Sequence, residues 1–166
     1  MAAFDDLDCN LRAMLSPEND VRRCAEVRWG DRCERAIDAA ATGLLERCAG
    51  RGDAGVRQLA FALLRRMAAR DWPKVAADVR AAAAPALLRV VDAQDEAAFA
   101  ARAAADCCAA LVQQGLGLER TDEDAYPNIL EWALARCAAP GPARPAALRV
   151  VERVAAEASP RLVSTD

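Results

Sequence analysis

A short sequence pattern recurs four times along this chain and constrains its fold more than any other feature. Each copy has valine or alanine, then arginine, then alanine three positions after the arginine. The arginines are Arg22, Arg57, Arg102 and Arg144, at intervals of 35, 45 and 42 residues, and each follows a turn signal. One match is uninformative in a chain rich in alanine and arginine. Four matches at similar intervals predict an internal repeat of about 40 residues.

The stretch 53–67 indicates what one repeat contains. Its apolar residues recur at steps of three and four, as in Val56, Leu63 and Met67, which is typical of an amphipathic helix. Asp53 stands where a helix N-cap is expected, and Pro73 cannot continue the helix. Such a helix cannot bury its apolar face alone, so each repeat needs helical neighbours.

Glycine, proline and aspartate residues typical of turns divide the whole chain into segments that are expected to be amphipathic helices. Gly30 is expected to end one helix, and Pro85 is expected to kink or break another. An aspartate precedes each of the first three patterns, namely Asp20, Asp53 and Asp95. We expect these aspartates and the pattern arginines to form a ladder of ion pairs between repeats. The expected helices are 4–15, 17–29, 32–48, 53–67, 73–91, 96–114, 126–138 and 143–158.

Composition supports an all-α fold. Hydrophobic residues make up 54% of the 166 residues but aromatic residues only 4%, so the apolar residues are mostly helix-forming alanine and leucine. The prediction is one α-α superhelix of the HEAT or armadillo type over residues 1–166, with about four helix pairs. The approximate repeats are 3–30, 32–71, 73–115 and 125–158, followed by a tail at 159–166. A closed helical bundle of similar length is the alternative fold.

The residue inventory argues against catalysis and cofactor binding. The chain has no histidine, no Gly-rich phosphate loop, and seven cysteines without C-x-x-C spacing. We therefore expect no catalytic site, cofactor or metal, and buried or half-buried free thiols. A net charge of −3 argues against direct nucleic-acid binding. No apolar run is long enough to span a membrane, and no signal peptide is visible, so we expect no membrane association.

Two stretches resemble the N-terminal HEAT repeats of importin-β-type nuclear transport receptors, the karyopherins. The first is Leu15-Ser-Pro-Glu-Asn-Asp-Val-Arg-Arg-Cys-Ala-Glu26, which is similar to the first-repeat turn and second helix of that family. The second is Arg57-Gln-Leu-Ala-Phe-Ala-Leu-Leu-Arg-Arg66, followed by Trp72. The branch that carries ribosomal proteins and histones looks most similar. Family members have many more repeats, so the chain resembles an N-terminal fragment or a truncated relative.

The resemblance implies a protein partner. In this family the second helices of the first repeats form a concave face that receives the small GTPase Ran in its GTP form, and the receptors occupy cytoplasm and nucleus. A cargo protein is implied only if further repeats exist. The positions that match this surface are Arg22, Arg23, Glu26, Arg57, Phe61, Leu64, Arg65, Arg66, Arg102 and Asp106. Among them, the pattern arginines also fit the inter-repeat ladder, and Leu64 also fits the core.

A structural scaffold or adaptor without a nucleotide-dependent partner is the alternative function, because it requires the same fold and core. Either function leaves the last helix pair without a successor. Its outer face, around Ile129, Leu130, Leu148 and Val151, is expected to be partly exposed and to promote self-association.

Overall fold

The computed structural model describes residues 2–93, 98–117 and 126–162. Within these ranges the chain forms eight α-helices and no strand, which confirms the predicted all-α class. A single turn of 3-10 helix, Trp72–Lys74, separates α4 from α5. The helices are α1 Ala2–Met14, α2 Asn19–Arg35, α3 Ile37–Ala49, α4 Ala54–Arg70, α5 Ala77–Asp92, α6 Ala98–Gly117, α7 Tyr126–Ala138 and α8 Arg144–Leu162.

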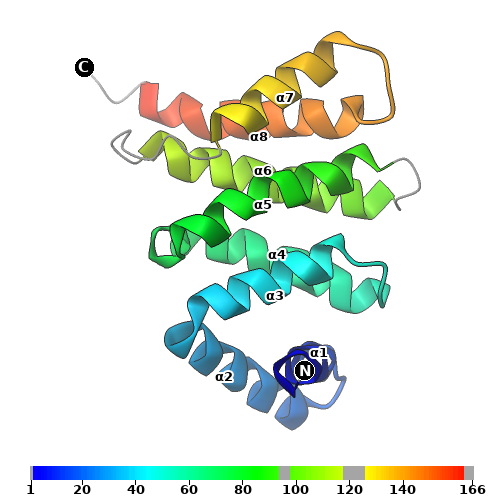
Figure 1. The fold of residues 1–166 in the computed structure, drawn as a ribbon, viewed down its shortest axis with the longest axis vertical. Coiled ribbons are helices and arrows are strands. Elements are labelled where there is room, and N and C mark those ends of the chain that lie inside the picture. The colour runs from blue at the N-terminus through cyan, green and yellow to red at the C-terminus, as the bar shows by residue number, and fades with distance from the viewer. Residues whose placement is uncertain (1, 94–97, 118–125, 163–166) are drawn as a thin grey trace.

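Consecutive helices pack as pairs, and the pairs stack along the chain. α3 packs on α4, α5 on α6 and α7 on α8, while α4, α6 and α8 form one layer and α3, α5 and α7 the other (Figure 1). Each pair contacts the next rather than closing around a common centre. This confirms the predicted HEAT-type α-solenoid over the closed bundle.

The first pair joins this stack in a different orientation. α1 is seen end-on in Figure 1, whereas the helices of the later pairs run across the view. α1 packs against α2 and α4, and α2 packs against α3. The Leu7 side chain reaches Gly43 on α3, where a Cβ atom would lie 2.5 Å from Leu7 Cδ2. An ion pair between Asp8 and Arg47, 2.5 Å apart, joins the same two helices.

Local sequence explains where α4 begins and how the next pair is joined. Asp53 Oδ1 accepts a hydrogen bond of 2.9 Å from the Val56 amide, which makes Asp53 the predicted N-cap. Trp72 is fully buried in the short 3-10 turn and anchors the crossover into α5. Asp38 on α3 accepts a hydrogen bond of 2.7 Å from the Ala76 amide, so the crossover is also tied to the preceding pair.

Two predicted helix ends were wrong, the one at Gly30 and the one at residue 158, and the break considered at Pro85 is absent. α2 continues through Gly30 and ends at Arg35, because Gly30 does not adopt the left-handed backbone that ends a helix, and the chain leaves the helical conformation only at Ala36. α5 continues through the exposed Pro85 without a break. α8 continues past Pro160 to Leu162. A proline removes one backbone hydrogen bond, and these helices tolerate that loss. Asp95 and most of the segment between the expected helices 96–114 and 126–138 lie outside the described residues.

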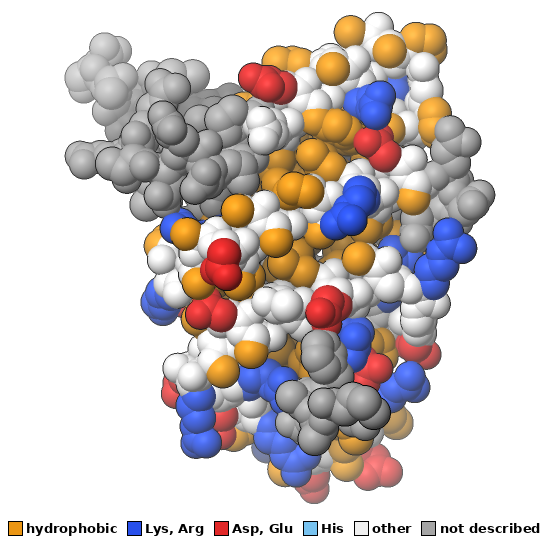
Figure 2. Space-filling view, in the orientation of Figure 1, with side chains coloured by type: hydrophobic (Ala, Val, Ile, Leu, Met, Phe, Trp, Pro, Cys, Tyr) orange, Lys and Arg blue, Asp and Glu red, His pale blue; other side chains and the backbone are white. Residues whose placement is uncertain are grey.

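The core is continuous through the stack and is built mainly from alanine, leucine and valine. Figure 2 shows that acidic and basic side chains are interspersed over the visible face, with hydrophobic side chains between them. No described helix is both long enough and apolar enough to cross a membrane. On the last pair, Leu134 and Leu148 are 61% and 43% exposed. Ile129 is fully buried, because it faces the core, so its predicted exposure was wrong.

Candidate protein-binding surface

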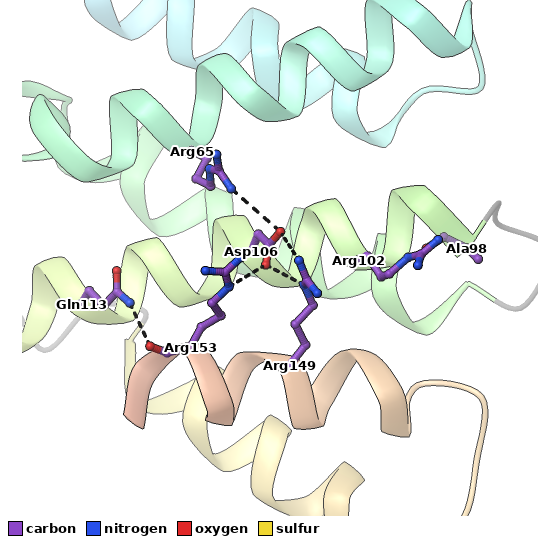
Figure 3. Close-up of polar contacts among 7 residues, drawn as sticks. All are labelled: Arg65, Ala98, Arg102, Asp106, Gln113, Arg149 and Arg153. Atoms are coloured by element: carbon purple, nitrogen blue, oxygen red, sulfur yellow. Dashed lines mark hydrogen bonds and ion pairs between the residues drawn. The ribbon is translucent and has the colours of Figure 1, made fainter. Parts of the chain in front are cut away.

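The layer formed by α4, α6 and α8 carries a compact group of charged side chains. Asp106 on α6 lies between the neighbouring helices and accepts two hydrogen bonds from Arg149 on α8, of 2.7 and 2.9 Å. Arg153, one turn further along α8, has its Nε atom 3.5 Å from Asp106 Oδ1. Arg65 on α4 approaches from the other side, at 3.9 Å from Oδ2 (Figure 3). We call these four residues the Asp106 cluster.

The Asp106 cluster has three positive groups and one negative group. The Asp106 side chain is 14% exposed, whereas the side chains of Arg65 and Arg153 are 54% and 51% exposed. The carboxylate is therefore sheltered beneath guanidinium groups that reach solvent. Hydrogen bonding to Asp106 raises the pKa of Arg149, so the Arg149 guanidinium stays charged throughout the physiological range. The cluster joins three successive repeats and gives this part of an acidic chain a local positive charge.

Polar contacts extend along α6 on both sides of the cluster. Arg102, one turn before Asp106, is exposed, and its Nε donates to the Ala98 carbonyl within its own helix at 3.1 Å. Gln113 donates to the Arg153 carbonyl on α8 at 3.3 Å, as Figure 3 shows. Gln114 donates to the Ala69 carbonyl on α4 at 2.9 Å. Because side-chain amides bridge to both neighbouring helices, the α4–α6–α8 layer has a defined register.

The structure narrows the predicted interface on α4. Phe61 and Leu64 are 2% and 1% exposed, and Arg57 is 6% exposed. Arg57 donates to the Cys48 carbonyl on α3 at 2.9 Å, and its guanidinium carbon lies 5.8 Å from the centre of the Phe61 ring. These three predicted positions are therefore packed inside the repeat and present little surface to a partner. Arg65 and Arg66 remain exposed on α4.

The predicted residues on α2 do not continue the α4–α6–α8 layer, because the first pair is oriented differently. Arg22 is half-buried. It donates to the Ser16 carbonyl at 3.3 Å, in the turn before α2, and to the side chain of Asn19, the first residue of α2. Arg23 and Glu26 are exposed. Of the ten predicted positions, Arg65 and Asp106 are the two that the structure joins by an ion pair.

An inter-repeat ladder exists, but its described part uses residues that differ from those predicted. Asp106 and Asp92 both bridge successive pairs, and Asp92 on α5 accepts hydrogen bonds from Arg136 and from the indole N–H of Trp132 on α7, all at 3.2 Å. Asp53 instead caps α4. Sequence reasoning missed Arg149 and Arg153. Their separation of four residues places both on one helix face, and this was the available signal.

The described cysteines differ in burial, and burial controls the reactivity of a thiol. No group of three or more histidine, cysteine, aspartate or glutamate side chains is arranged there to hold a metal ion. Burial raises the pKa of Cys48 and of Cys108 to about 12, and also raises the pKa of Cys107. These thiols stay protonated at neutral pH. Cys9 and Cys24 are exposed, in contrast to the expectation that all would be at least half-buried.

Comparison with known proteins supports the fold. No family model and no curated protein matches the sequence. Among solved structures, the chain is similar to part of Kap121p in a crystal structure of Kap121p bound to RanGTP, with a TM-score of 0.76 and 22% sequence identity. The match covers 92% of this chain and 14% of the Kap121p chain. At this level of identity the likeness shows the fold, a HEAT-repeat architecture like that of a karyopherin.

Proposed function

We propose that this chain is a protein-binding HEAT-repeat module that receives a Ran-type small GTPase in its GTP form. The observation that carries the proposal is the likeness over 92% of the chain to Kap121p, which was crystallised with RanGTP. Fold alone does not determine function, so the proposal also depends on a surface of suitable chemistry.

The proposed contact residues are those predicted positions that reach the surface. Arg65, Arg66 and Arg102 are exposed on α4 and α6, and Arg23 and Glu26 are exposed on α2. Arg22 and Asp106 are partly exposed. Arginine is enriched in protein–protein interfaces because its planar donor group binds carboxylates and carbonyls with defined geometry. A surface of mixed charge between alanine-rich helices therefore suits a folded protein partner.

The direct test is a pull-down in which the immobilised chain is offered Ran loaded with GTP or with GDP. The proposal expects retention of the GTP form and little retention of the GDP form. Equal retention of both forms, or retention of neither, would refute it. Arg66→Glu should weaken retention of the GTP form, because it reverses a charge on the proposed surface. Arg89→Glu is the matched control, since Arg89 is an exposed arginine on α5, in the opposite layer.

A structural scaffold or adaptor without a nucleotide-dependent partner is the second candidate. It is favoured by the bidentate contact between Asp106 and Arg149. Asp106 is one of the proposed contact residues, and this contact uses it to hold two repeats together. This candidate predicts that any protein retained by the chain is retained equally in the presence of GTP and GDP. Membership of the receptor branch that carries ribosomal proteins and histones stays a prediction, as does cargo binding through further repeats. Distribution between cytoplasm and nucleus is proposed on the same basis, and microscopy of a fluorescent fusion tests it.

A further inference from the structure

The hydrogen-bonding capacity of the Asp106 cluster is unbalanced. Three guanidinium groups carry about fifteen N–H donors, whereas one carboxylate offers about four acceptor sites. Arg149 occupies both oxygens of Asp106 at hydrogen-bond distance, and Arg153 and Arg65 are held at 3.5 and 3.9 Å. The side chains of the two outer arginines are 54% and 51% exposed, so donors that Asp106 does not engage are accessible to solvent on the α4–α6–α8 layer.

From this imbalance we propose that the Asp106 cluster binds an acidic segment of a protein partner. Carboxylates of that segment pair with Arg65 and Arg153, which flank Asp106 from α4 and α8 (Figure 3). Each new carboxylate also reduces the repulsion among three positive groups that are gathered around one negative group. The inference rests on the protein-binding function proposed above. It does not require that the partner be a GTPase.

Charge distribution favours an acidic protein segment over nucleic acid. The chain has a net charge of −3, so a long polyanion would be repelled by most of its surface. Glu152 lies beside Arg149 on α8 and further limits the positive area to the cluster itself. A short segment with two or three carboxylates fits such a small site, because arginine forms two parallel hydrogen bonds with a carboxylate. Nucleic acid needs a broader basic face to neutralise its phosphates.

The test is fluorescence anisotropy with the full chain and a labelled peptide in which glutamate alternates with glycine. A peptide with lysine in place of glutamate and a single-stranded DNA oligonucleotide are the comparison probes. The glutamate peptide should bind, and its binding should weaken as salt concentration rises. Arg65→Ala and Arg153→Ala should each lower affinity about two- to fivefold, and the double variant should lower it about tenfold. Arg89→Ala on α5 is the matched control and should leave affinity unchanged.

Asp106→Asn gives a prediction of opposite sign. It removes the competing carboxylate while keeping a side chain of the same size, so affinity for the glutamate peptide should rise severalfold. The two arginine variants keep the proposal testable if this variant does not fold, because both arginines are more than half exposed. Absence of peptide binding, unchanged affinity in the double arginine variant, or equal binding of the oligonucleotide would overturn the inference. If the unmodified chain does not bind the glutamate peptide but still retains GTP-loaded Ran selectively, this inference fails and the proposed function stands.

Discussion

Replacing a helical glycine with alanine is expected to change stability in opposite directions at Gly43 and Gly30. Both residues lie inside helices, in α3 and α2 respectively. At Gly30 an added Cβ atom would meet nothing within 4 Å. At Gly43 it would lie 2.5 Å from Leu7 Cδ2, a separation too short for two carbon atoms. The pair therefore separates the intrinsic helix preference of alanine from the packing of α1 on α3.

The expected magnitudes follow from these surroundings. Alanine is favoured over glycine inside a helix by about 0.8–1 kcal/mol, so Gly30→Ala should raise the free energy of unfolding by that amount. Gly43→Ala has the same gain but forces Leu7 to move, and Leu7 is only 2% exposed. Overpacking a buried site costs about 1–3 kcal/mol. The net effect of Gly43→Ala should be a loss of about 0–2 kcal/mol, and the two variants should differ by about 1–3 kcal/mol.

Urea unfolding followed by circular dichroism measures both variants, with the slope checked for constancy. Leu7→Ala provides the control, because it removes the atom that the new Cβ would meet. The single Leu7→Ala variant should lose about 2–5 kcal/mol. In that background Gly43→Ala should stabilise rather than destabilise. Destabilisation by Gly30→Ala would mean that α2 ends at Gly30, and stabilisation by Gly43→Ala alone would mean that α1 is not seated on α3.

Three further predictions concern other parts of the molecule. Phe61→Ala should lower the free energy of unfolding by about 3–5 kcal/mol in urea titrations, because the ring is 2% exposed; a change near zero would place Phe61 at the surface. Leu134 and Leu148 are exposed on the last helix pair, so self-association through this face should raise the apparent mass in light scattering as protein concentration rises. The double variant Leu134→Glu, Leu148→Glu should reduce that rise. An apparent mass independent of concentration in the unmodified chain would contradict self-association there. Burial raises the pKa of Cys108 to about 12, above the value of about 8.5 expected when unfolded, so its stability contribution is complete below about pH 8.5 and declines as pH rises toward 12. The free energy of unfolding, measured by titration at several pH values in this range, should therefore fall less steeply with pH for Cys108→Ala than for the unmodified chain. Equal slopes would argue against a protonated buried thiol.

Helix number and pairing could be predicted from sequence because turn residues and apolar spacing act locally. Pro17, Asp53 and the Pro140-Gly-Pro142 stretch lie between or at the start of helices in the structure, as their chemistry requires. Gly30 misled the prediction, because glycine permits a helix to end but does not require it. The chain instead leaves helical geometry at Ala36, where φ is −152° and ψ is 59°. No local preference of alanine signals such a change.

The arrangement of charges around Asp106 could not be predicted, because it depends on how one repeat is seated on the next. Sequence spacing shows which residues share a helix face, but it does not show which positions of two stacked helices meet. Asp106 and Arg149 are 43 residues apart, and their contact requires the register of α8 on α6. Arg57 illustrates the same limit: its place in the repeat pattern indicated a ladder or a partner contact, and its Nε instead bonds to Cys48 within the same helix pair. A repeat pattern therefore identifies candidate surface residues, and the stacking geometry decides which of them a partner can reach.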